Sequence, residues 1–168
     1  MKNSNTEKLV RTGLMAALCC VATFIHIPTF FTLGYVNLGD GFVLSSAFLL
    51  GPFWGALAGG IGSMLADLFL GYPAYAPGTF VIKGLMALLC GICFFKLSKK
   101  TRKNLPLKIL CAVLGEAVMV LGYLVYEAYI LKYGMAALGS VYGNIFQGIA
   151  GIIFSVLISE FIKKKIKF

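Results

Sequence analysis

Residues 35–91 decide the fold, and they read YVNLGDGFVLSSAFLLGPFWGALAGGIGSMLADLFLGYPAYAPGTFVIKGLMALLCG. The stretch holds three apolar segments, which a Gly-Pro pair at 51–52 and a Tyr-Pro pair at 72–73 separate. Small residues dominate the middle segment, as is typical of helices that pack closely inside a membrane. Four polar residues interrupt the apolar pattern: Asn37, Asp40, Asp67 and Lys83. Because ionisable groups are costly inside a membrane, the stretch predicts a binding site as well as an anchor.

The composition of the chain is that of an integral membrane protein. Of its 168 residues, 60% are hydrophobic and 12% are charged, whereas a soluble domain is typically about half apolar and about a quarter charged. The apolar segments are long and continuous, without the alternation of a membrane β-barrel. Backbone groups in a bilayer must be satisfied within helices, so we expect an all-α integral membrane protein with one domain over residues 1–168.

Six transmembrane helices are expected from the apolar segments and their breaks. Their approximate ranges are 7–27, 35–50, 52–70, 78–97, 106–131 and 137–162. Lys and Arg gather near the N-terminus, over residues 96–108 and over residues 163–167, whereas the opposite loops hold only Lys132. This asymmetry predicts that both termini are cytoplasmic. It also predicts that the short second segment crosses the membrane, because five crossings would separate the basic ends.

The net charge of +9 is explained by this topology and by contact with anionic membrane lipid. Nucleic-acid binding would need basic residues on a folded soluble face, and the chain has no such domain. We therefore expect no nucleic-acid partner.

Polar side chains recur in the outer half of the expected helices. Asp67 and Lys83 lie at similar depths on antiparallel neighbours, so they are expected to be able to pair. In the fifth helix Glu116, Tyr123 and Glu127 are spaced by seven and four residues, which places them on one stripe of the helix. Glu116 is nearer the middle, whereas Tyr123 and Glu127 lie in the outer half, and the convergence of polar residues there favours a pocket that faces outward.

The sixth helix and the loops add further candidates to this pocket. Tyr75 lies between two prolines, on a stiffened loop that is suited to act as a lid. The candidate substrate-binding residues are Asn37, Asp40, Asp67, Tyr75, Lys83, Tyr123, Glu127, Asn144 and Gln147. Such residues can also only hold helices together, or anchor the protein at the membrane interface, so a purely structural role stays open.

Several kinds of catalytic or cofactor site are missing from the sequence. There is no GxxxxGK[ST] motif and no HExxH motif, and the chain has a single histidine. The five cysteines all lie in apolar segments, and the spacing of Cys90 and Cys93 lacks the context of a redox motif. We expect no cofactor, no metal and no enzyme. The alternatives are an intramembrane enzyme that uses Glu116 or Glu127 as acid or base, and a structural membrane subunit.

Four segments carry a resemblance to a known family: NLGD at 37–40, FLLGPFWGA at 48–56, AGGIGSMLAD at 58–67 and YAPGTFVIKG at 75–84. With the six-helix plan, they resemble the substrate-binding S component of energy-coupling factor (ECF) vitamin transporters. The similarity extends over nearly the whole chain. It is nearest to the branch that includes riboflavin, pyridoxine and hydroxymethylpyrimidine carriers.

The resemblance implies a function in vitamin uptake at the bacterial plasma membrane. Such a subunit captures its vitamin from outside, and its partners are a transmembrane coupling subunit and two cytoplasmic ATPases. The family docks the coupling subunit on an alanine pattern of the first helix. Here small residues stand at that spacing: Gly13, Ala16, Ala17 and Cys20. The polar candidates favour pyridoxine or hydroxymethylpyrimidine as substrate, with riboflavin as the alternative.

Overall fold

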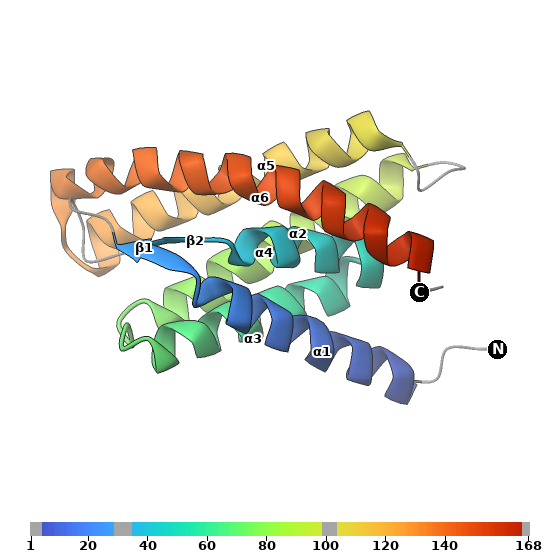
Figure 1. Cartoon of the computed structure of the whole chain (residues 1–168). Coiled ribbons are helices and arrows are strands. Elements are labelled where there is room, and N and C mark those ends of the chain that lie inside the picture. Colours follow the sequence, from blue (N-terminus) through green and yellow to red (C-terminus); the bar gives the residue numbers. More distant parts are fainter. Residues whose placement is uncertain (1–4, 29–34, 99–103, 166–168) are drawn as a thin grey trace.

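Proline and glycine set several helix boundaries in the computed structural model, which describes residues 5–28, 35–98 and 104–165. Six α-helices account for most of these residues (Figure 1). The elements are α1 (Asn5–Thr23), β1 (His26–Pro28), β2 (Tyr35–Asn37), α2 (Gly39–Leu50), α3 (Pro52–Phe69), α4 (Ala76–Leu97), α5 (Leu105–Val125), the π-helical turn η1 (Tyr126–Ile130), the 3-10 turn η2 (Gly134–Ala137) and α6 (Leu138–Lys165). The six expected helices are all present, and several of their ends differ from the prediction by a few residues.

The first helix is shorter than predicted, and a small hairpin follows it. We expected helix to about residue 27, but α1 ends at Thr23 and β1 pairs with β2 in antiparallel register, His26 opposite Asn37. The residue before a proline is biased toward extended backbone, which favours a strand ahead of Pro28. The described chain therefore keeps the expected all-helical fold class and adds only this short two-stranded pairing.

Helix α2 lies at the centre of the bundle. It contacts α1, α3, α4 and α6, and nearly all of its residues are buried. Apart from Asp40 and two serines its sequence is apolar or glycine, as expected for a helix surrounded by others. The turn into α3 is made by Gly51, whose φ of 89° favours glycine, and Pro52 then takes a first helical position. The Gly-Pro break thus joins two helices that pack directly together.

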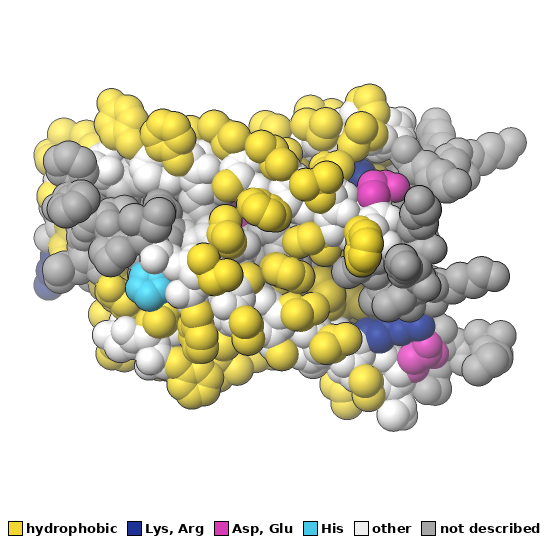
Figure 2. All heavy atoms as spheres, viewed as in Figure 1, with side chains coloured by type: hydrophobic (Ala, Val, Ile, Leu, Met, Phe, Trp, Pro, Cys, Tyr) yellow, Lys and Arg dark blue, Asp and Glu magenta, His cyan; other side chains and the backbone are white. Residues whose placement is uncertain are grey.

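The surface of the bundle is that of a membrane protein. Within the described residues, three helical stretches are long and apolar enough to cross a membrane: Ala76–Leu97, Leu105–Ile130 and Gly134–Phe161. Figure 2 shows apolar side chains over most of the visible face. Large apolar side chains are exposed on several helices, among them Leu9, Val21, Phe69, Leu121 and Phe146. Exposed apolar surface on this scale suits contact with lipid.

The two ends of the bundle differ in what they contain. Helix α1 begins and α6 ends at one end, which we call the termini end (Figure 1). Most of the charged side chains visible in Figure 2 gather there. The opposite end, which we call the hairpin end, carries β1, β2, the α3–α4 loop and the turns η1 and η2 (Figure 1).

Candidate functional site

A buried ion pair forms the middle of the candidate site. The Lys83 ammonium of α4 pairs with the Asp40 carboxylate of α2, and their side chains are 2% and 0% exposed. The Gln147 amide of α6 donates from Nε2 to Asp40 Oδ2 at 2.6 Å, and Gln147 Oε1 accepts from the Asn37 backbone N–H at 2.7 Å. These four residues, Asn37, Asp40, Lys83 and Gln147, are the central polar cluster. It links one strand to three helices.

Local structure explains why Asp40 can lie here as a charged group. It is in the first turn of α2, where the helix dipole favours a negative charge. Just ahead of that turn, Asn37 Oδ1 accepts a hydrogen bond from the Gly39 N–H at 2.8 Å. The side chain of Asn37 therefore holds the strand against the beginning of the helix that carries Asp40.

Lys83 has a second polar neighbour in Tyr123 of α5. The ammonium lies 5.4 Å from the centre of the Tyr123 ring, within the range of a cation–π contact. The Tyr123 hydroxyl is 2.9 Å from Oγ1 of Thr79, one turn before Lys83 on α4. Tyr123 thus joins α5 to the same side of the cluster.

A second group of contacts lies at the hairpin end. The Tyr75 hydroxyl, at the beginning of α4, donates to Glu127 Oε1 at 3.2 Å, and Ser140 donates to Glu127 Oε2. Tyr126 donates from its hydroxyl to the Ala74 backbone carbonyl at 2.7 Å. We call Tyr75, Glu127 and Ser140 the loop clamp, because they fasten the α3–α4 loop to η1 and α6. Glu127 lies in a π-helical turn, and such turns are frequent at functional sites.

The structure brings most of the predicted binding residues into these two groups. The central polar cluster and its Tyr123 contact contain five of them, and the loop clamp contains Tyr75 and Glu127. Asn144 is buried on α6, one turn before Gln147. Ser140 and Thr79 were not predicted, since isolated hydroxyl residues carry no distinguishing pattern in a sequence.

The expected pairing of Asp67 with Lys83 is wrong. Asp67 is buried near the end of α3, as its position predicted, but Lys83 forms its ion pair with Asp40. The sequence predicts that the two residues lie at the same depth in the bundle. It does not predict in which direction each side chain points around its helix. Asp40, the partner of Lys83, lies fully buried within the first turn of α2.

Glu116 of α5 is a buried acid that was left out of the predicted binding set. Its side chain is 5% exposed, and neither carboxyl oxygen has a hydrogen-bond partner among the described residues. The sequence signal that could have indicated a role for Glu116 was its spacing from Tyr123 and Glu127, which places the three residues on one stripe of the helix. In the structure these three residues face three different sets of neighbours.

The predicted docking residues on α1 do not share one environment. Gly13 and Ala17 are exposed, Ala16 is half-buried and Cys20 is buried. No atom of the described chain lies within 4 Å of the position that a Cβ on Gly13 would take. The open part of this helix face is therefore the part formed by Gly13 and Ala17.

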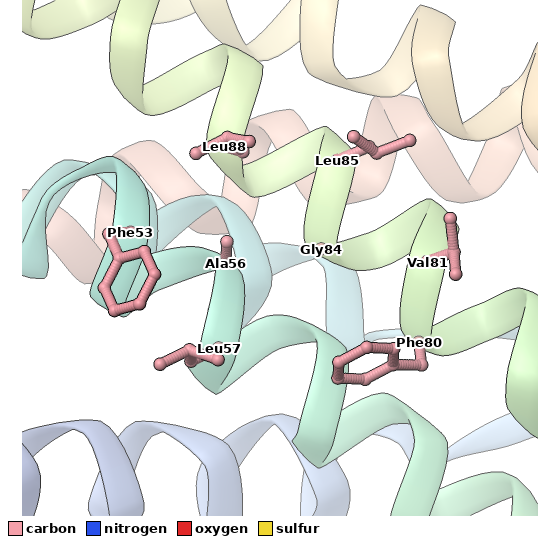
Figure 3. Close-up of a pocket in the computed structure, with 8 residues that line it drawn as sticks. All are labelled: Phe53, Ala56, Leu57, Phe80, Val81, Gly84, Leu85 and Leu88. Carbon is pink, nitrogen blue, oxygen red and sulfur yellow. The ribbon is translucent and has the colours of Figure 1, made fainter.

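An apolar groove lies on the outside of the bundle between α3 and α4 (Figure 3). Its volume is about 290 Å³, and it is lined by Phe53, Ala56, Leu57, Phe80, Val81, Gly84, Leu85 and Leu88. Since none of these side chains is polar, the groove offers no side-chain hydrogen bonds to a polar ligand. The polar candidates all lie away from it.

Metal and thiol chemistry find little support in the described part of the chain. It holds no group of three or more His, Cys, Asp or Glu side chains that could bind a metal ion. All five cysteines are free thiols, and Cys90 of the predicted CxxC spacing is buried. Recognition of a ligand by hydrogen bonds and charge is the chemistry that the site supports.

Comparison with known proteins adds a matching family model and two relatives. A family model described as ECF-type riboflavin transporter, S component, matches residues 3–164. The thiamine precursor transporter HmpT of Lactococcus lactis subsp. cremoris is 28% identical over 166 residues, which cover 98% of this chain and 92% of the relative. An uncharacterized protein of Pyrococcus woesei is 39% identical over 150 residues, covering 89% and 97%.

Two solved structures share the fold. The S component of a bacterial ECF transporter superposes with a TM-score of 0.76 at 22% identity, covering 98% of this chain and 100% of that one. The S component for biotin from an ECF-type ABC transporter gives a TM-score of 0.72 at 19% identity, covering 97% and 94%. At these identities the likeness is one of fold.

Proposed function

Because the chain belongs to the family of S components of ECF-type riboflavin transporters, we propose that it captures pyridoxine or hydroxymethylpyrimidine for import. S components are membrane proteins that bind a vitamin or its precursor. The family and both solved neighbours are transporter subunits and not enzymes, which argues against the intramembrane-enzyme alternative.

The observation that carries the proposal is the central polar cluster. A charged pair that is almost fully buried inside a membrane bundle is expensive, and such groups commonly mark a substrate site. The cluster presents carboxylate, ammonium and amide groups together with the Tyr123 ring. This set suits a small, flat ring that carries hydroxyl groups and ring nitrogens.

The choice among vitamins rests on the size of the ligand and on one relative. HmpT, which covers nearly the whole chain, is a thiamine precursor transporter, and this supports a pyrimidine ligand. Riboflavin is the second candidate, because the matching family model is described by that vitamin. Riboflavin is much larger than a single ring, so a pocket that holds it would have to be correspondingly larger.

The proposed orientation places the hairpin end outside and both termini in the cytoplasm. It is supported by the basic segments at the N-terminus, near residues 96–108 and at the C-terminus. It is further supported by the location of the beginning of α1 and the end of α6 at the same end of the bundle (Figure 1). The proposed location is the bacterial plasma membrane.

The proposed partners are a transmembrane coupling subunit and two cytoplasmic ATPases. We assign docking to the exposed small residues Gly13 and Ala17 of α1, because small side chains permit close helix contact. Changing Gly13 to Leu should abolish assembly and transport while vitamin binding stays normal, since that position is open. Unchanged assembly would contradict this assignment.

The test of the proposed function is identification of the bound ligand. The protein is purified in detergent and denatured, and any released small molecule is identified by mass spectrometry. Titration with hydroxymethylpyrimidine, pyridoxine and riboflavin then gives the three affinities. A vitamin that binds to the wild type, and binds more weakly to Asn144→Ala, supports the proposal. Failure of all three ligands to bind would contradict it.

A further inference from the structure

The buried carboxyl of Glu116 carries a further inference, which rests on the proposed function. The side chain is 5% exposed on the inner face of α5, and both of its oxygens are without a hydrogen-bond partner among the described residues. An ionised carboxylate can accept several hydrogen bonds, and leaving a buried one without any is costly. An acid with this much unused capacity is expected to meet its partner in the bound ligand.

The structure holds the Glu116 carboxyl next to the central polar cluster. A Cβ added to Gly151 of α6 would lie 2.5 Å from Glu116 Oε1 and 2.8 Å from Asp40 Cβ. A Cβ on Gly148 would lie 3.2 Å from Glu116 Oε2. The two carboxyl side chains are therefore neighbours across one glycine.

The charges of this region favour a ligand that donates hydrogen bonds. Lys83 and Asp40 neutralise each other in their ion pair. Burial favours the neutral form of Glu116, so its carboxylate would add a negative charge to this apolar bundle only beside a group that compensates the charge. A cationic ligand group would restore neutrality, whereas an anionic ligand group would be repelled.

We propose that Glu116 recognises the ligand by accepting two hydrogen bonds from the N–C–N edge of an amino-substituted ring, as in a protonated aminopyrimidine. The two oxygens of a carboxylate match two neighbouring N–H donors, the same geometry that makes paired guanidinium contacts strong. One donor is the exocyclic amino group and the other is the protonated ring nitrogen. Glu116 thereby selects aminopyrimidines over rings that carry only hydroxyl groups.

The test combines a protein variant with a ligand variant. Binding of hydroxymethylpyrimidine and of its analogue without the amino group is measured by calorimetry for the wild type and for Glu116→Gln. We expect the wild type to lose about tenfold or more in affinity when the amino group is removed, as is usual for a hydrogen bond to a charged group. Glu116→Gln should bind hydroxymethylpyrimidine about tenfold or more weakly, and removing the amino group should cost this variant little more.

The matched control is Glu160→Gln at the termini end, whose acid is 48% exposed and should leave ligand affinity unchanged. A thermal melt of each variant without ligand checks that it is folded. Equal affinities for wild type and Glu116→Gln would overturn the inference, as would independent losses from the two changes. In either case Glu116 would be a neutral packing acid.

The same titrations separate failure of this inference from failure of the proposed function. A wild type that binds pyridoxine or riboflavin but no aminopyrimidine overturns the role of Glu116 and leaves the carrier function standing. A wild type that binds none of the three vitamins overturns both. A loss of binding in Glu116→Gln that depends on the amino group supports both.

Discussion

The molecule contains two buried lysines with similar contacts and different surroundings. Lys83 is 2% exposed and pairs with Asp40, and Lys108 is 0% exposed and pairs with Glu160. Each ammonium also lies near an aromatic ring, Lys83 at 5.4 Å from Tyr123 and Lys108 at 5.8 Å from Phe48. The difference is in the acids, since Asp40 is 0% exposed and Glu160 is 48% exposed.

We interpret this difference as one between a structural contact and a proposed ligand contact. Lys108 is itself fully buried, but it pairs with the half-exposed Glu160 and donates to Ser159, so one charge of this pair keeps contact with the surface. In the Lys83–Asp40 pair both charged side chains are buried. A charged pair of that kind is a poor source of stability, which makes a role in ligand recognition the better explanation.

The largest contrast is expected from removing each lysine. Lys83→Met leaves the Asp40 charge buried without its partner, and it should lower the free energy of unfolding by about 3–5 kcal/mol. Lys108→Met leaves Glu160 half-exposed and hydrated, so its cost should stay within about 1 kcal/mol. Denaturant titration in mixed micelles measures both values.

A double variant checks that the loss of stability in Lys83→Met comes from the unpaired charge of Asp40. Asp40→Asn combined with Lys83→Met removes both charges, so much of the lost stability should return while ligand binding stays lost. If the two single lysine variants were equally destabilised, the proposed distinction between the Lys83–Asp40 pair and the Lys108–Glu160 pair would be wrong.

A smaller contrast is expected from the hydrogen bonds around each pair. Gln147→Leu removes the amide that bonds Asp40 Oδ2 and the Asn37 N–H, so two buried groups lose a partner. We expect a loss of stability of about 1–3 kcal/mol and weaker vitamin binding. Ser159→Ala at the termini end should cost about 1 kcal/mol and leave binding intact. Equal binding by both variants would contradict a ligand role for the cluster.

Much of the fold follows from local signals in the sequence. The Gly51–Pro52 pair placed the end of α2 and the beginning of α3 where the structure has them, because proline suits a first helical position. The end of α1 was missed because it depends on the pairing of β1 with β2. Residues 26–28 and 35–37 are separated in sequence, and no local pattern in either segment indicates the other.

The site was predicted in part for a related reason. Depth along a helix can be counted from the sequence, so the buried position of Lys83 and the position of Glu127 toward the hairpin end could be predicted. Direction around the helix depends on packing, and therefore the partner of Lys83 could not. Glu116 shows the same limit. Its spacing from Tyr123 and Glu127 could be counted in the sequence, but the sequence does not show that Gly148 and Gly151 of α6 pack against it.

The smallest effect is expected at the loop clamp, which lies at the hairpin end. Tyr75→Phe removes only the hydroxyl that donates to Glu127 at 3.2 Å, so the loop loses one contact and keeps its packing. We expect the vitamin to dissociate roughly two- to tenfold faster, the usual range for a single hydrogen bond. Stopped-flow measurement of release gives the rate.

Tyr129→Phe is the matched control, since Tyr129 lies in the same π-helical turn as Glu127 and is 76% exposed. A release rate that changes equally in both variants would mean that the clamp does not close the site, and the route to Asp40 and Lys83 would then have to open elsewhere in the bundle.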